Sequence, residues 1–197
     1  PNAAAGFIDD QQWQQLRAGF DENPSAQPRQ TVLAEYVAKQ ALQHAGLQPE
    51  AFSQVASGLF LGANKYCANS QDLDLACMCL DERGSLDLDR FLQRQERVEH
   101  PFARRVDQQT LHLAKRLGIR DHISTHSDAC AAGTVAIGSA YRAIERGEID
   151  LAICGAVELM ANELPYYMFN SLGALCQKAD VPAQQQSRPF MRDRSGF

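Results

Sequence analysis

Long hydrophobic runs are missing from this sequence. Nowhere in its 197 residues do apolar residues approach the roughly 18 consecutive positions that indicate a membrane-spanning helix. The first ten residues, PNAAAGFIDD, also lack the basic and apolar regions of a secretory signal peptide. Positive charge is scarce as well, since 19 Lys and Arg stand against 24 Asp and Glu, and a general nucleic-acid-binding protein carries a basic surplus. We therefore expect neither a membrane nor a nucleic acid as partner.

Recognisable metal, disulfide and phosphate patterns are missing too. Of the six cysteines, Cys77 and Cys79 form one close pair, but no second pair follows at zinc-site spacing. Cys130 and Cys154 lie among small apolar residues, a setting typical of buried free thiols. The glycine-containing stretch 133–138 lacks the Lys-Ser/Thr of a phosphate-binding loop. The sequence predicts a reduced, cytoplasmic chain with no metal and no cofactor.

What is present is an ordinary globular composition, with 45% hydrophobic and 22% charged residues. A chain of this length can bury a core without covalent staples, as one large domain or two small ones. Apolar spacing predicts helices over 11–20, 31–45 and 108–117 and a buried strand over 55–61.

The stretch 63–107 is the least regular part of the chain. We expect helices over 72–80 and 86–98, and charges run densely from Arg90 to Arg105. Such a run indicates a solvated helix face or, alternatively, a surface that docks a partner. We interpret 63–107 as a charged helical insertion or cap within the domain.

The last third of the sequence reads as strand, helix, strand. The segment 122–127 is strand-like, 131–146 has helical spacing, and the apolar stretch 151–159 reads as a second strand. This order predicts parallel strands joined by a helical crossover. Small residues on nearly every face of the helix predict close packing on several sides, in the centre of the domain.

Cys130 is the main candidate for chemistry, because it lies where the strand gives way to the helix. The partial positive charge and the free N–H groups of a helix N-terminus favour a thiolate there. The same N–H groups could hold the oxyanion formed when a thioester is attacked. The alternative is that Cys130 is merely a small buried hydrophobic residue.

Other candidates carry weaker signals. Strand alternation places His122, Ser124 and His126 on one side, where His126 is either a base for Cys130 or a structural residue. Cys154 and Cys176 are interpreted as packing residues.

The segment DACAAGTVAIGSAYRAIERGEIDLAICGAVE, which contains Cys130, resembles the active-site region of β-ketoacyl-[acyl carrier protein] synthases. The later stretch SRPFMRDRSGF is similar to the family's Arg-Pro-Phe-Asp-x-x-Arg-x-Gly-Phe pattern. The resemblance covers residues 30–62 and 108–197. It implies an α/β, thiolase-like fold: a mixed, mainly parallel five-stranded sheet layered with helices, with the catalytic cysteine at the N-terminus of a buried central helix.

By this resemblance Cys130 accepts an acyl chain as a thioester and Phe169 lines the acyl pocket. The family's β-ketoacyl synthases join that chain to malonyl-[acyl carrier protein] by decarboxylative Claisen condensation, in fatty-acid or polyketide biosynthesis. The implied partners are acyl carrier protein, with phosphopantetheine-linked acyl and malonyl groups, and a second ketosynthase-like chain in a homodimer or heterodimer. Because the carrier is acidic, we expect it to dock on basic residues, with Arg104, Arg105, Lys115, Arg116 and Arg120 as candidates.

Some features depart from the family pattern. Asp128 stands where the family usually has Thr, and its carboxylate would oppose a thiolate two residues away. By the resemblance, residues 1–197 look like the N-terminal half of a synthase, without the family's usual first strand and without the half that carries the catalytic histidines and lysine. We therefore expect the chain to be inactive alone. Two alternatives stay open: a non-catalytic partner of the chain-length-factor type, and a thiolase acting on coenzyme A thioesters.

Overall fold

The computed structural model describes residues 8–18, 29–63, 75–95, 106–160, 163–178 and 180–196. The chain divides into two compact units. The first, here called the sheet unit, comprises Asp10–Tyr66 and Val98–Leu159; the second unit comprises Pro1–Asp9, Cys67–Arg97 and Met160–Phe197. No helix of the described part is long and apolar enough to cross a membrane.

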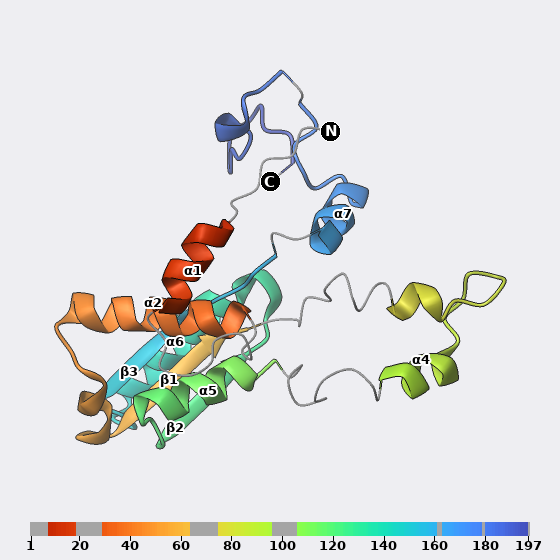
Figure 1. Cartoon of the computed structure of the whole chain (residues 1–197). Helices are drawn as coiled ribbons and strands as arrows, with labels where there is room; N and C mark the ends of the chain where they lie inside the picture. The colour runs from red at the N-terminus through yellow and green to blue at the C-terminus, as the bar shows by residue number, and fades with distance from the viewer. Residues whose placement is uncertain are drawn as a thin grey trace. The chain divides into compact units, whose positions relative to one another are not determined.

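A parallel sheet forms the centre of the sheet unit (Figure 1). Its strands are β1 (Ser57–Gly62), β2 (His122–His126) and β3 (Leu151–Ala156), in the order β2-β1-β3. Every residue of β1 is buried, because this strand has a neighbour on each side and helices on both faces. The predicted α/β layering and parallel pairing are confirmed. The five-stranded mixed sheet is not confirmed, because the described residues form three strands and all their pairings are parallel.

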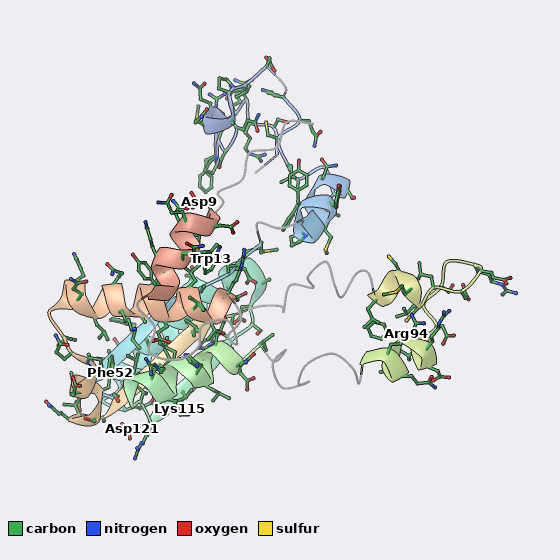
Figure 2. The ribbon with its side chains drawn as sticks, in the orientation of Figure 1. Asp9, Trp13, Phe52, Arg94, Lys115 and Asp121 are labelled. Atoms are coloured by element: carbon green, nitrogen blue, oxygen red, sulfur yellow. The ribbon has the colours of Figure 1, made fainter. Side chains whose placement is uncertain are left out.

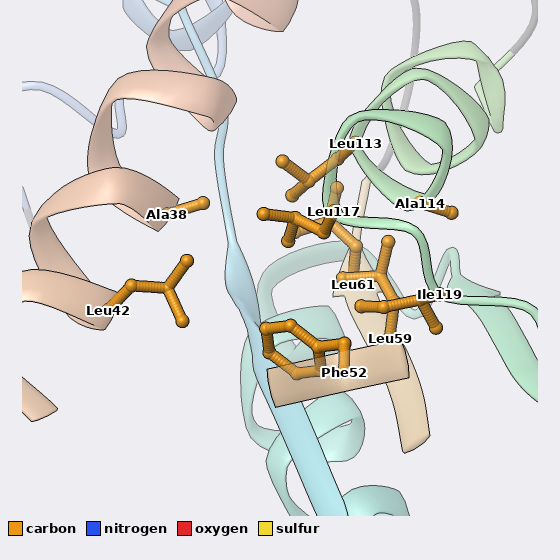
Figure 3. Packing of buried hydrophobic residues seen from close by; sticks show 9 residues of the cluster. All are labelled: Ala38, Leu42, Phe52, Leu59, Leu61, Leu113, Ala114, Leu117 and Ile119. Atoms are coloured by element: carbon orange, nitrogen blue, oxygen red, sulfur yellow. The ribbon is translucent and has the colours of Figure 1, made fainter. Parts of the chain in front are cut away.

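Two helices, α2 (Arg29–Ala45) and α5 (Gln108–Leu117), cover one face of this sheet. Leu59 and Leu61 of β1 point into this layer, where the cluster drawn in Figure 3 is completed by Ala38, Leu42, Phe52, Leu113, Ala114, Leu117 and Ile119. Phe52 comes from the short 3-10 helix η2 (Pro49–Ser53). The helix α1 (Asp10–Ala18) packs on α2 and buries Trp13, whose ring lies 5.1 Å from the Arg29 guanidinium carbon.

The opposite face is covered by α6 (Ala132–Glu145). Phe60 alternates to this side of β1 and packs with Ala136, Ala140 and Ala143 of the helix. The prediction that α6 is packed on several sides is not confirmed within the described chain, where its other face is exposed. Ile137 is 55% exposed and Tyr141 64% exposed, because no described element packs over this second apolar stripe.

Helix ends follow the local sequence signals. The predicted bounds of α5 match the structure, and Gly118 ends the helix with φ of 71° and an N–H donated back into the last turn. The strand predicted over 151–159 ends earlier, at Ala156, where Val157 donates its N–H to the Gly62 carbonyl.

The second unit contains α4 (Leu88–Gln95), α7 (Glu163–Ser171) and the 3-10 helix η5 (Ala183–Gln185). Helices predicted over 72–80 and 86–98 are shorter where the structure describes them. Residues 75–78 are helical, and Leu80 instead pairs antiparallel with Leu86. The Asp81 side chain accepts hydrogen bonds from the backbone N–H groups of Arg83 and Ser85. These bonds stabilise the turn that connects Leu80 to Leu86.

Candidate active site

Cys130 lies in a short turn between the end of β2 and the start of α6. The turn is the 3-10 helix η4 (Ala129–Ala131), which leads directly into α6. Hydrogen bonds join the end of β2 to the end of β1: Ala63 donates its N–H to the His126 carbonyl at 2.9 Å, and Ser127 donates its hydroxyl to the Ala63 carbonyl at 2.7 Å. The cysteine is therefore carried on a turn that is anchored to the central strand.

The turn holds an unusual backbone conformation. Ala129 has φ of 50°, in the left-handed region that costs a residue with a Cβ about 1 kcal/mol. Conformations of this kind concentrate at functional sites, where the surrounding structure enforces them. Here the strained residue immediately precedes the candidate nucleophile.

The Cys130 thiol is exposed in the structure. The alternative interpretation, a small buried hydrophobic residue, is therefore wrong. The expectation of a buried thiol failed because the small apolar neighbours of Cys130 belong to the inner face of α6, whereas Cys130 precedes the helix.

Backbone donors near Cys130 are partly occupied. Ala131 donates its N–H to the Asp128 carbonyl at 3.0 Å, and Ala132 donates to the Ala129 carbonyl. These two groups are thus not available to an oxyanion, contrary to the general expectation for the helix terminus.

Close packing brings the start of α6 against the end of β1. A Cβ added to Gly62 would lie 2.7 Å from the Ala132 carbonyl carbon and 2.8 Å from the Gly133 nitrogen. A Cβ on Gly133 would in turn lie 3.1 Å from Ala156 on β3. The absence of side chains at both glycines therefore sets how closely Cys130 approaches the strand ends.

The predicted row of polar side chains on β2 lies on the α6 side of the sheet. Phe60 belongs to the α6 layer and stacks on both histidines, with ring centroids 4.5 Å from His122 and 6.4 Å from His126. Ser124 and His126 share a 3.2 Å hydrogen bond. These contacts give both histidines structural partners, and the role of His126 as a base stays an untested prediction.

The other cysteines differ in their exposure. Cys154 is exposed, so its interpretation as a packing residue is wrong, although partial burial raises the pKa of its thiol. Cys176 is half-buried, and Cys79 is fully buried beside an exposed Cys77. No group of three or more potential metal ligands occurs among the described residues.

One of the predicted docking residues is already engaged. Arg116 donates its Nε to the Glu35 carboxylate at 3.3 Å and is only about a quarter exposed. Lys115 and Arg120 are exposed, and Lys115, labelled in Figure 2, lies on α5. Arg104 and Arg105 lie outside the described residues. Only Lys115 and Arg120 therefore remain as described candidates.

Sequence reasoning missed Glu35, the most heavily engaged carboxylate of the described chain. Its side chain is 3% exposed and lies 2.9 Å from His112 Nε2 and 3.2 Å from Lys39 Nζ, besides its contact with Arg116. Burial by itself would raise the pKa of Glu35, but hydrogen bonds from His112 and Lys39 and the charge of Arg116 hold it below its usual range. A Glu on the apolar face of a helix was the signal that could have revealed it.

Comparison with known proteins identifies the family. The sequence model of the family described as "Beta-ketoacyl synthase, N-terminal domain" matches residues 2–197. The chain belongs to the beta-ketoacyl synthase family. Among characterised relatives, the tetracenomycin polyketide synthase ketoacyl synthase alpha subunit of Streptomyces glaucescens is 28% identical over 174 residues. The 3-oxoacyl-[acyl-carrier-protein] synthase 2 of Synechocystis sp. is 40% identical over 84 residues.

The matched region is a part of each relative. It covers 88% of this chain but 39% of the Streptomyces protein, and 43% of this chain but 20% of the Synechocystis protein.

Solved structures support the fold. A type II ketosynthase in complex with its acyl-carrier protein, AntDE:AntF, has a TM-score of 0.63 at 24% identity, over 83% of this chain and 39% of that one. The ishigamide ketosynthase/chain length factor has a TM-score of 0.59 at 22% identity, over 90% and 42%. The chain therefore has the fold of part of a ketosynthase.

Proposed function

We propose that the natural polypeptide carrying this sequence is a beta-ketoacyl synthase and that Cys130 is its nucleophile. The observation that carries this proposal is the exposed thiol on a strained turn between a parallel strand and a helix N-terminus. A thiol in this place meets the positive end of the α6 dipole. Membership of the beta-ketoacyl synthase family agrees with that role.

The first step would be transfer of an acyl group. The Cys130 thiolate attacks the carbonyl carbon of an acyl thioester, and a new C–S bond forms as the bond to the donor sulfur breaks. The donor leaves as a thiolate, which takes up the proton that Cys130 gave up. By the family resemblance, the backbone N–H of Cys130 would stabilise the oxyanion between these events.

The second step would be condensation with malonyl-[acyl carrier protein]. Loss of CO₂ from the malonyl group leaves a carbanion that attacks the Cys130 thioester, so a C–C bond forms and the Cys130 thiolate is released. By the resemblance to β-ketoacyl synthases, we assign the decarboxylating histidines to the C-terminal half of the family fold, whereas His112 is bound to Glu35 and His122 and His126 stack on Phe60.

A complementary half would cover the exposed face of α6. Ile137, Tyr141 and Ile144 form an apolar stripe of the kind that a partner surface buries. In this proposal residues 1–197 are the N-terminal half of a thiolase-like enzyme, 63–107 is its charged insertion or cap, and Phe169 on α7 lines the acyl pocket.

Acyl carrier protein and a second ketosynthase-like chain are the proposed partners. The carrier would dock on Lys115 and Arg120, whose exposed positive charges complement an acidic surface. Replacing both by Glu should weaken carrier binding and leave acyl transfer from a small thioester unchanged. Unaltered carrier affinity in this double variant would place the docking surface elsewhere.

A non-catalytic partner role has one observation in its favour. Asp128 is exposed two residues before Cys130, at the position where the resembling family usually has Thr.

Labelling with cerulenin, a cysteine-reactive inhibitor of ketosynthases, separates the two functions. The proposed function predicts one adduct on the intact natural polypeptide, mapped to Cys130 and absent from the Cys130→Ala variant. A folded protein with Cys130 unlabelled would contradict catalysis and favour the non-catalytic role.

A further inference from the structure

The Glu35 cluster is built from residues far apart in the chain. Its carboxylate on α2 is held by His112 and Arg116 on α5, which lie 77 and 81 residues away in sequence. Lys39, one turn along α2, is a third group within hydrogen-bond distance of the same carboxylate. The cluster therefore ties α2 to α5 by directional, charge-assisted hydrogen bonds.

These bonds provide directional positioning that the neighbouring apolar core does not. Leu113 and Leu117 also hold α5 against the sheet, but hydrophobic contact is non-directional and tolerates sliding. A buried carboxylate bound by two groups on successive turns of α5 fixes the position of that helix along α2. Glu35 thus fixes the register of α5, meaning its position along the axis of α2.

The register of α5 is passed on to β2 by a second buried contact. Thr125 on β2 donates its hydroxyl to Thr110 on α5 at 2.8 Å, and Thr110 is fully buried. In the described sheet β2 is an edge strand, paired with β1 only. Its position therefore depends on α5 more than that of a strand paired on both sides would.

The end of β2 carries the strained turn. Beyond Thr125, the His126 carbonyl and the Ser127 hydroxyl bond to Ala63, and Ala129 then adopts its left-handed conformation immediately before Cys130. A shift of β2 would move the anchors that enforce this conformation.

From this continuous series of contacts we infer that Glu35 is a positioning residue for Cys130, acting through α5, the Thr110–Thr125 hydrogen bond and β2. The inference rests on the proposed role of Cys130 as nucleophile. It assigns to a buried carboxylate on the far side of the sheet a part in setting the reactivity of the thiol.

The test measures alkylation of Cys130 by iodoacetamide in the folded natural polypeptide, followed by peptide mass analysis. Glu35→Gln should slow this reaction about fivefold, a size typical of coupling through packed networks. Glu148→Gln is the matched control, because Glu148 is also ion-paired, with Arg146 at 2.7 Å, but is exposed after α6. It should leave the rate within about twofold of wild type, the margin for independent sites.

A double-mutant cycle separates positioning from general loss of stability. Thr125→Val breaks the next contact in the series, so Glu35→Gln combined with Thr125→Val should slow alkylation no more than the slower single variant. Additive effects of the two substitutions on the logarithm of the rate would overturn the inference. If Glu35→Gln does not fold, Arg116→Gln takes its place in the same cycle.

The result also separates this inference from the proposed function. Acyl transfer to Cys130 in wild type, together with an unchanged alkylation rate in Glu35→Gln, would overturn the inference alone. No acyl transfer to Cys130 in wild type would overturn the proposed function, and the inference with it.

Discussion

The two faces of the central sheet are packed with side chains of different size. Towards α2 and α5, β1 presents Leu59 and Leu61 to large side chains such as Phe52 and Leu117. Towards α6 it presents Phe60 to a helix whose inner face is alanine. Large interlocking side chains bury more area and supply stability, whereas alanine lets a helix approach the strands closely. The α6 face therefore buries smaller side chains than the opposite face, and its small residues allow the start of α6, next to Cys130, to lie close to the strand ends.

The largest effect should come from the leucine face. Leu59→Ala removes a fully buried side chain at the centre of the core, and it should lower the free energy of unfolding by about 3 kcal/mol. Urea unfolding followed by circular dichroism measures the change. A loss below about 1 kcal/mol would show that this face is not the main source of stability.

The Glu35 cluster on the same face should make stability depend on pH. Because the pKa of Glu35 is lowered on folding, its ion pairs stabilise the protein at pH values above the ordinary range of Glu, and this contribution is lost as the pH falls through the folded-state pKa. Glu35→Gln should therefore cost about 2 kcal/mol at neutral pH. The difference from wild type should shrink as acid is added, and a difference that stays constant with pH would contradict the ionic origin.

The close approach on the α6 face should be sensitive to one added methyl group. Gly62→Ala places a Cβ against the backbone of Ala132 and Gly133 and should cost about 2 kcal/mol in unfolding free energy. Gly138→Ala is the matched control, since the nearest atom to its added Cβ is 3.5 Å away, on the Arg142 side chain. The control should stabilise α6 by about 0.5 kcal/mol, because Ala has the higher helix propensity. Equal effects of the two substitutions would contradict tight packing at Gly62.

The smallest effect on stability should come from the outer stripe of α6. Ile137→Ser replaces a half-exposed side chain that has no described layer over it, so the unfolding free energy of this chain should change by less than about 0.5 kcal/mol. The same substitution should reduce self-association measured by sedimentation. A loss of stability comparable to that of Leu59→Ala would show that the stripe is buried within the chain.

Local signals predicted the elements well. The bounds of α5 followed from a periodic apolar face and Gly118, and β1 followed from a short apolar run before Gly62. The position of Cys130 before α6 was predicted because a change from strand to helical spacing is visible in the sequence.

Properties that depend on distant partners could not be predicted in this way. Arg116 looked like a free surface charge, because its partner Glu35 is 81 residues away. The small residues of α6 predicted burial on every face of the helix, but the sequence alone does not show which face packs against the sheet. The left-handed conformation of Ala129 has no local signal, since alanine does not favour it; the surrounding hydrogen bonds enforce it.

Acyl transfer to the thiol tests the central claim most directly. The natural polypeptide is incubated with an acyl-[acyl carrier protein], and its mass is measured intact and after digestion. We predict one acyl group, released by hydroxylamine as a thioester and mapped to Cys130, that is retained in Cys154→Ser and lost in Cys130→Ala. Acylation that persists in Cys130→Ala, or its absence from the folded wild-type protein, would contradict the assignment of Cys130 as the nucleophile.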